Sequence, residues 1–112
     1  MAVGKDGPNL NLCDENGKQR ACLVVDENGP ALGLYDATGK LGAYLCAKKV
    51  GAAVALQDEN GKSRVVLNAG KEYSGLNLFD ENGKRRASLL VRKNGTGLDL
   101  YDKNGQVLRS LP

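Results

Sequence analysis

The chain contains no histidine and no tryptophan, and its aromatic side chains are four tyrosines and one phenylalanine. Without histidine, general acid–base catalysis loses its commonest participant and a zinc site loses one of its main ligands. The three cysteines include no Cys-X-X-Cys pair, and their odd number argues against a disulfide framework. A Ser-His-Asp set, a phosphate-binding loop and a dinucleotide-binding fingerprint are all missing. We therefore expect a chain that is not an enzyme and that carries no metal or other cofactor.

Long apolar runs and a strong excess of one charge are missing as well. No stretch approaches the ~18 apolar residues that a membrane-spanning helix needs, and the N-terminus has no signal-peptide core. The expectation is a cytoplasmic protein without a membrane span. Sixteen basic and thirteen acidic residues leave a net charge of +3, which is too small by itself to indicate binding of nucleic acid or another polyanion.

What the chain does contain is a repeat of 22 residues. The glycine of an Asp-X-(Asn/Thr)-Gly turn recurs at this step at Gly17, Gly39, Gly61, Gly83 and Gly105. A second glycine series follows the same step at Gly7, Gly29, Gly51 and Gly95, with Tyr73 at the one position out of pattern. No linker interrupts the repeat. The sequence predicts one domain over residues 1–112, with repeats at approximately 2–23, 24–45, 46–67, 68–89 and 90–111.

Each repeat has the pattern of a β-hairpin, because apolar residues alternate with other residues on both sides of a glycine turn. The Asn16-Gly17 pair predicts a two-residue type I′ loop, in which both central residues need a positive φ. This loop places Leu12 opposite Ala21 and Leu10 opposite Leu23.

The second kind of turn, residues 26–30, predicts that Val25 lies opposite Leu32 and Leu23 opposite Leu34. Pro30 cannot donate a hydrogen bond, so we expect this turn to be looser than the first. Together the two turns predict an all-β fold: an antiparallel up-and-down meander of about ten strands from five 22-residue hairpin repeats.

The alternation puts leucines in equivalent positions on one face of the predicted sheet. This candidate interface or core face comprises Leu10, Leu12, Leu23, Leu32, Leu34, Leu45, Leu56, Leu67, Leu76, Leu78, Leu89, Leu98 and Leu100. Ten strands give a face of roughly 1,000 Å². Such a large apolar face needs to be buried.

Three arrangements would bury it. The preferred one is a closed or flattened barrel, in which residues 106–111 and 1–3 form two halves of one closing strand. The alternative is an open sheet that packs against another copy of the chain. A β-solenoid with 22-residue coils is less favoured, because Asn-Gly loops suit hairpins better than parallel coils.

Charged residues near the hairpin turns form a second candidate site. If the strands align, a basic row lies along one rim, comprising Lys18, Arg20, Lys40, Lys62, Arg64, Lys84 and Arg86. Such a row could bind a polyanion. Glu15, Glu59 and Glu81 lie opposite the lysines, and cross-strand Glu–Lys pairing is the favoured role.

The repeated turn aspartates, of which Asp14 is the first, are expected to cap the turns through their side chains rather than to bind calcium. Cys13, Cys22 and Cys46 are expected on the face opposite the leucines, as passive thiols.

These features favour a non-catalytic structural or assembly protein that acts through its surface and associates with itself. The alternative is a small barrel that binds an apolar ligand among the leucines, and a polyanion-binding sheet is the weaker alternative. The repeat length and hairpin form are similar to those of MORN-type repeats, but the aromatic-and-glycine signature of that family is missing and nothing is carried over from it. The regular period also fits an engineered or designed repeat protein, whereas the irregular segments at residues 48–50 and 71–73 look more natural.

Overall fold

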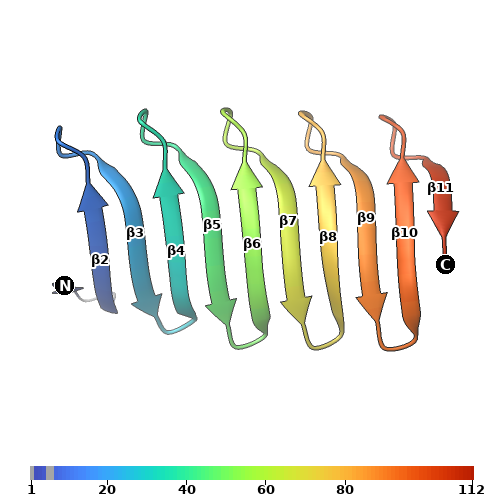
Figure 1. Cartoon of the computed structure of the whole chain (residues 1–112), viewed down its shortest axis with the longest axis horizontal. Helices are drawn as coiled ribbons and strands as arrows, with labels where there is room; N and C mark the ends of the chain where they lie inside the picture. Colours follow the sequence, from blue (N-terminus) through green and yellow to red (C-terminus); the bar gives the residue numbers. More distant parts are fainter. Residues whose placement is uncertain (1, 5–6) are drawn as a thin grey trace.

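The computed structural model of the chain describes residues 2–4 and 7–112, and these form a single antiparallel sheet with the strands in sequence order (Figure 1). Within this part of the chain every regular element is a strand. The strands are β1 (Ala2–Gly4), β2 (Gly7–Cys13), β3 (Gln19–Asp26), β4 (Gly29–Tyr35), β5 (Leu41–Lys48), β6 (Gly51–Gln57), β7 (Ser63–Gly70), β8 (Tyr73–Phe79), β9 (Arg85–Arg92), β10 (Gly95–Tyr101) and β11 (Val107–Leu111). The predicted all-β meander is confirmed.

The Asp-X-(Asn/Thr)-Gly turns lie along one rim of the sheet, which we call the hairpin rim. In the first of them, the N–H of Gly17 donates to the carbonyl of Asp14, and the N–H of Asp14 donates to the carbonyl of Lys18. The predicted register is confirmed, since Leu12 pairs with Ala21 and Leu10 with Leu23.

The predicted type I′ loop is wrong. Among the described residues only glycines have a positive φ, and Gly17 reaches +80° while Asn16 does not. The turn needs a single left-handed residue because the pairing of β2 with β3 shifts between Leu12 and Cys13, which absorbs the extra residue as a bulge.

The turns at the opposite rim are tighter than the sequence indicated. Asp26 pairs directly with Gly29, whose φ is +116°, so Val25 lies opposite Pro30 and Leu23 opposite Leu32. The predicted pairing of β3 with β4 is therefore wrong by two residues. Because side chains alternate with a period of two, this shift keeps every leucine on the predicted face.

The sheet is open, so the preferred closed or flattened barrel is not confirmed. β1 and β11 lie at opposite ends of the strand order, and the molecule extends 48 × 30 × 17 Å. Ten spacings of about 4.8 Å span roughly 48 Å, which is the length of a sheet that hardly curls across its strands. Residues 2 and 3 of the proposed closing strand lie in β1, far from β11, and residue 1 lies outside the described residues.

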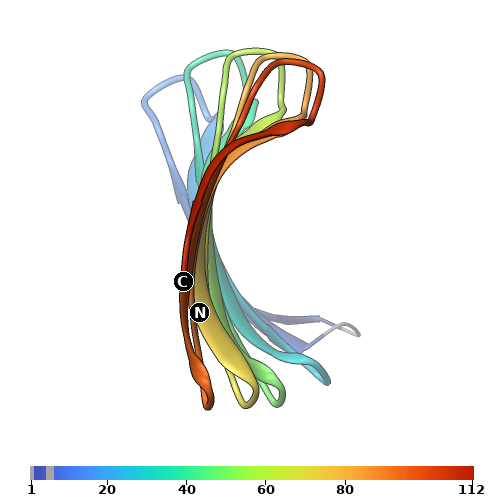
Figure 2. The same ribbon diagram turned by 90° about the vertical axis from the view of Figure 1, so that its right-hand side faces the viewer.

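The strands bend along their own length instead, as Figure 2 shows, so the sheet has an inner and an outer face. The face opposite the leucines carries small side chains in its middle, including Gly33, Cys46, Ala55 and Ser88, and we call it the small-residue face. Although the described residues form one layer, Cys46 is only 6% exposed and Ser88 only 1%. Such burial without a covering layer places this face on the inside of the bend, where side chains converge.

Candidate interaction surface

The leucine face is built from two rows of side chains that run across the sheet. In the central row each residue pairs directly with the next, so all of them lie on one side. The central row consists of Leu10, Leu23, Leu32, Leu45, Val54, Leu67, Leu76, Leu89, Leu98 and Leu111.

The second row lies nearer the hairpin rim and alternates leucines with smaller side chains, except at its last residue, which is an arginine. It consists of Leu12, Ala21, Leu34, Ala43, Leu56, Val65, Leu78, Ala87, Leu100 and Arg109. The structure thus brings all thirteen predicted leucines onto one face. Notches beside the alanines of this row suit interdigitation with another apolar surface.

Nothing in the described part of the chain covers this leucine face. Ten of the thirteen predicted leucines are at least 39% exposed, and Leu12 reaches 60%. Leu32, Leu76 and Leu98 are half-buried. A soluble monomer seldom presents a contiguous apolar patch of more than ~300–600 Å², and the leucine face exceeds this at roughly 1,000 Å². Because apolar surfaces of this size are typical of interaction sites, the leucine face is the candidate interaction surface.

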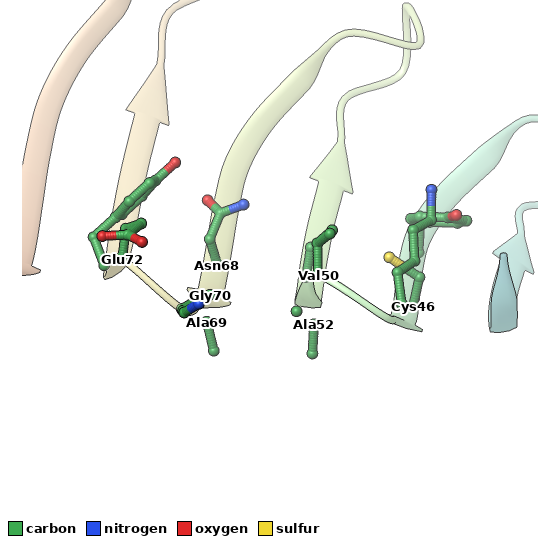
Figure 3. Close-up of a pocket in the computed structure, with 13 residues that line it drawn as sticks. Cys46, Val50, Ala52, Asn68, Ala69, Gly70 and Glu72 are labelled. Carbon is green, nitrogen blue, oxygen red and sulfur yellow. The ribbon is translucent and has the colours of Figure 1, made fainter.

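The small-residue face has a hollow of about 610 Å³ over β5–β8, close to the rim opposite the hairpin rim. Tyr44, Cys46, Ala53 and Asn68 are among the residues that line it, and Figure 3 shows Cys46 and Asn68 on one side of the sheet. The irregular segments at residues 48–50 and 71–73 both border it. Burial is the largest cause that raises the pKa of Tyr44, and a hydrogen bond with Cys46 is the next largest cause. Sequence reasoning missed this hollow, although the two irregular segments were a signal.

The basic residues of the hairpin rim join neighbouring repeats. Arg64 donates through Nε to the carbonyl of Phe79 at 2.8 Å and lies 3.4 Å from the carboxylate of Asp58. Arg20 and Arg86 make the equivalent pairs with their own neighbours. These guanidinium groups are therefore already bonded to the sheet.

Three of the four rim lysines, all except Lys84, also reach the next repeat. Lys40 and Lys62 donate through Nζ to the carbonyls of Glu59 and Glu81 at 2.8 and 2.9 Å, and Lys18 donates to Ala37 at 3.4 Å. In the part of the chain that the structure describes, the ion pairs are the three Arg–Asp pairs, and Glu–Lys pairing does not occur. The favoured cross-strand Glu–Lys role is therefore wrong, because the lysines extend along the rim to main-chain oxygens.

The turn aspartates cap their turns as predicted. One carboxylate oxygen of Asp14 accepts from the N–H groups of Asn16 at 2.9 Å and Lys18 at 3.0 Å. The same pair of bonds occurs in all five repeats. The bond from the main chain of Lys18 is the largest cause that lowers the pKa of Asp14, and equivalent bonds do so for Asp58 and Asp80. The Thr38 hydroxyl is the first cause for Asp36.

The three thiols lie on the small-residue face, Cys13 exposed, Cys22 half-buried and Cys46 buried. Across residues 2–4 and 7–112, His, Cys, Asp and Glu side chains nowhere gather in threes as a metal site requires. In the same residues there is no helix with the length and apolar character needed to cross a membrane.

Comparison with known proteins does not extend this description. No protein-family model matches the chain, and no curated protein matches it either. The geometry of the leucine face therefore carries the functional argument.

Proposed function

We propose that the chain is a non-catalytic assembly protein whose leucine face binds the leucine face of a second copy. The observation that carries this proposal is the central row, in which nine leucines and one valine lie side by side while Leu45, for example, remains 47% exposed. A second leucine face can remove this apolar surface from water, because in a two-fold contact both copies bury the same residues.

The size of the face fits this partner. Each copy would bury at most roughly 1,000 Å², because the leucine face lies on the outside of the bend, hence up to about 2,000 Å² in total, which reaches the range of permanent protein interfaces. Two twisted sheets pack about 10 Å apart with their strands roughly 30° from parallel, as in β-sandwiches. The leucines of the central row would then contact the central row and the second row of the other copy across a two-fold axis.

Light scattering on a size-exclusion column, under reducing conditions, tests the proposal. We expect the mass of two copies or a multiple of two. A single species of 11.9 kDa at micromolar concentration would contradict the proposal.

A second candidate function is the binding of a small apolar ligand in the hollow over β5–β8. Its support is the volume of about 610 Å³ and the tyrosine and alanine side chains that line it. Titration with a hydrophobic dye tests this candidate. Binding that is lost in Ala53→Arg, but kept in Ala43→Arg on the leucine face and outside the hollow, is the expected result.

A further inference from the structure

The fourth repeat departs from the other repeats at the rim opposite the hairpin rim. In the other four repeats, the strand that follows the turn at this rim begins with a glycine, such as Gly51, whereas β8 begins with Tyr73. The strand that precedes the turn ends with Gly70, where the neighbouring repeats have Lys48 and Arg92. The fourth repeat thus has a glycine in place of a long side chain on β7, and an aromatic ring in place of a glycine on β8.

This departure opens the floor of the hollow over β5–β8. The floor is formed by the paired ends of β6 and β7, where Gly51 lies opposite Gly70 and Ala53 opposite Asn68. Because the two glycines and the alanine have small side chains or none, a flat apolar ligand can approach the main chain closely. The Asn68 amide, labelled in Figure 3, adds a polar group that can donate and accept hydrogen bonds. At about 610 Å³ the hollow has the size of a small-molecule site, for which ~300–1,000 Å³ is usual.

Two tyrosines line the sides of this floor. Tyr44 comes from β5, and Tyr73, which is 43% exposed, comes from β8. The equivalents of Tyr44 in the other repeats are the smaller residues Cys22, Val66, Ser88 and Ser110. β5 and β8 are three strand spacings apart, roughly 14 Å, which leaves room for a fused aromatic ring system between them. Since tyrosine rings pack well against other aromatic rings, the two side walls favour an aromatic ligand.

The charged groups at the hollow favour an anion. Lys48 and Lys71 line it from the two irregular segments, and both are exposed. In the described part of the chain neither lysine makes a side-chain hydrogen bond or an ion pair, whereas most lysines of the hairpin rim are bonded to main-chain oxygens. Among the described residues that line the hollow, Glu72 is the one acid, so two positive charges face one negative charge. Asp26 acts on Tyr44 through its charge but does not line the hollow.

We propose that the hollow binds a small aromatic anion, with its ring over the floor between Tyr44 and Tyr73 and its carboxylate or phosphate at Lys48 and Lys71. This inference rests on the second candidate function and names the class of ligand. The ring covers the apolar floor, and each ammonium group donates a charge-assisted hydrogen bond to the anion. The hollow lies on the small-residue face, which stays uncovered when two leucine faces meet, so the ligand and a second copy can bind together.

Two fluorescent probes with the same aromatic rings test the role of the anion. Anilinonaphthalene sulfonate carries one negative charge, and phenylnaphthylamine has the same rings without the sulfonate. We expect the unmodified protein to bind the sulfonate at least about tenfold more tightly at low salt. Added salt should remove most of this difference, because exposed charges are screened.

Replacing both lysines tests which groups bind the anion. Lys48→Gln with Lys71→Gln should lower the affinity for the sulfonate to that of the neutral probe, and should leave the affinity for the neutral probe unchanged. The matched control is Lys84→Gln with Lys103→Gln, which removes two positive charges at the hairpin rim. This control should keep the preference for the sulfonate.

Gly70→Leu tests the location, because both probes can also bind to the leucine face. Gly70 does not have a positive φ, and the nearest atoms to an added Cβ lie 3.5 and 3.6 Å away, so the backbone accepts a side chain there. We expect Gly70→Leu to fill the floor and remove the probe signal of the hollow, and Ala53→Leu to do the same. Gly97→Leu is the control, since Gly97 lies on the same face outside the hollow, with no described atom within 4 Å of an added Cβ. Circular dichroism checks that each variant is folded.

The possible results separate this inference from the second candidate function. Equal affinity for the two probes, with both signals lost in Gly70→Leu, would overturn the anion and leave the apolar-ligand function standing. Absence of binding, or binding that Gly70→Leu and Ala53→Leu do not change, would overturn both. A preference for the sulfonate that survives Lys48→Gln with Lys71→Gln would overturn the role given to the two lysines.

Discussion

The two faces of this sheet contain similar numbers of side chains but differ in how much of those side chains is exposed to water. On the small-residue face, Ser88 and Cys46 are buried although no second layer lies over them. On the leucine face, the much larger Leu45 and Leu67 remain 47% and 45% exposed. The bend of the strands explains the difference, because side chains converge on the inside of a bend and diverge on the outside. The fold of one chain thus buries small residues such as Ser88 and leaves its large leucines exposed to water.

The largest expected effect comes from charging the central row. Leu45→Asp with Leu67→Asp puts two carboxylates where a second copy would cover them, and an unpaired buried charge is strongly unfavourable. We expect self-association through this face to weaken by at least about 100-fold in sedimentation velocity. The fold itself should persist, because both positions face water in the single sheet.

Val50→Asp is the matched control for this pair of substitutions. Val50 is 81% exposed in a tight turn, outside the central row, so the same apolar-to-acid change there should leave association unaltered. Equal weakening in both variants would show that net charge, and not the leucine face, governs association.

Substitutions at Ser88 test the small-residue face. Ser88→Leu overfills a position that is 1% exposed, and we expect the free energy of unfolding to fall by about 1–3 kcal/mol. Ser88→Ala should cost nothing or stabilise the protein, because the hydroxyl has no hydrogen-bond partner in the protein. Chemical denaturation measures both. If either variant changed the oligomer mass, the two faces would not be independent.

A smaller effect is expected where the hairpin rim ties neighbouring repeats together. Arg64→Met removes the bond to the Phe79 carbonyl and the pair with Asp58, and should lower the free energy of unfolding by about 1 kcal/mol. Arg92→Met is the control, since Arg92 makes no side-chain hydrogen bond within the described residues. Equal losses in the two variants would contradict the inter-repeat role of Arg64.

The smallest expected effect is a dependence of stability on acidic pH, which arises at the hairpin turns. The carboxyls of Asp14, Asp36, Asp58 and Asp80 have pKa values below the ordinary 3.8 because the turn N–H groups, and at Asp36 first the Thr38 hydroxyl, favour the charged form. Their contribution to stability is therefore complete above pH 3.8 and is lost as the pH falls through the lowered values. Thermal melts of Asp80→Asn should depend less on pH in this acid range than melts of Glu81→Gln.

The hairpins could be predicted from sequence because turn chemistry and apolar alternation agree there. Asn16-Gly17 and the spacing of Leu12 and Ala21 point to one register, and the structure has it. At the second turn, Pro30 suggested a looser loop, but the turn to β3 does not use its N–H, because Pro30 and Val25 exchange no hydrogen bonds. The missing N–H instead affects the β5 side, where pairing stops at Ala31 and Cys46. The local sequence pattern alone could not distinguish a loose turn from the two-residue turn.

Closure of the sheet could not be predicted from sequence for a different reason. The apolar alternation is the same for a barrel and for an open sheet, and the choice depends on whether the sheet curls across its strands or bends along them. The signal for bending lay in the small residues at the middle of the opposite face, such as Gly33 and Ser88. The contacts of Lys40 and Arg64 with the next repeat depend on the same spatial alignment.

The most direct test of the account is the thickness of the particle in solution, measured by small-angle X-ray scattering. The bent single sheet has a shortest dimension of 17 Å, and a second sheet packed on the leucine face adds about 10 Å. The account predicts a two-layer cross-section, and a one-layer cross-section would contradict it.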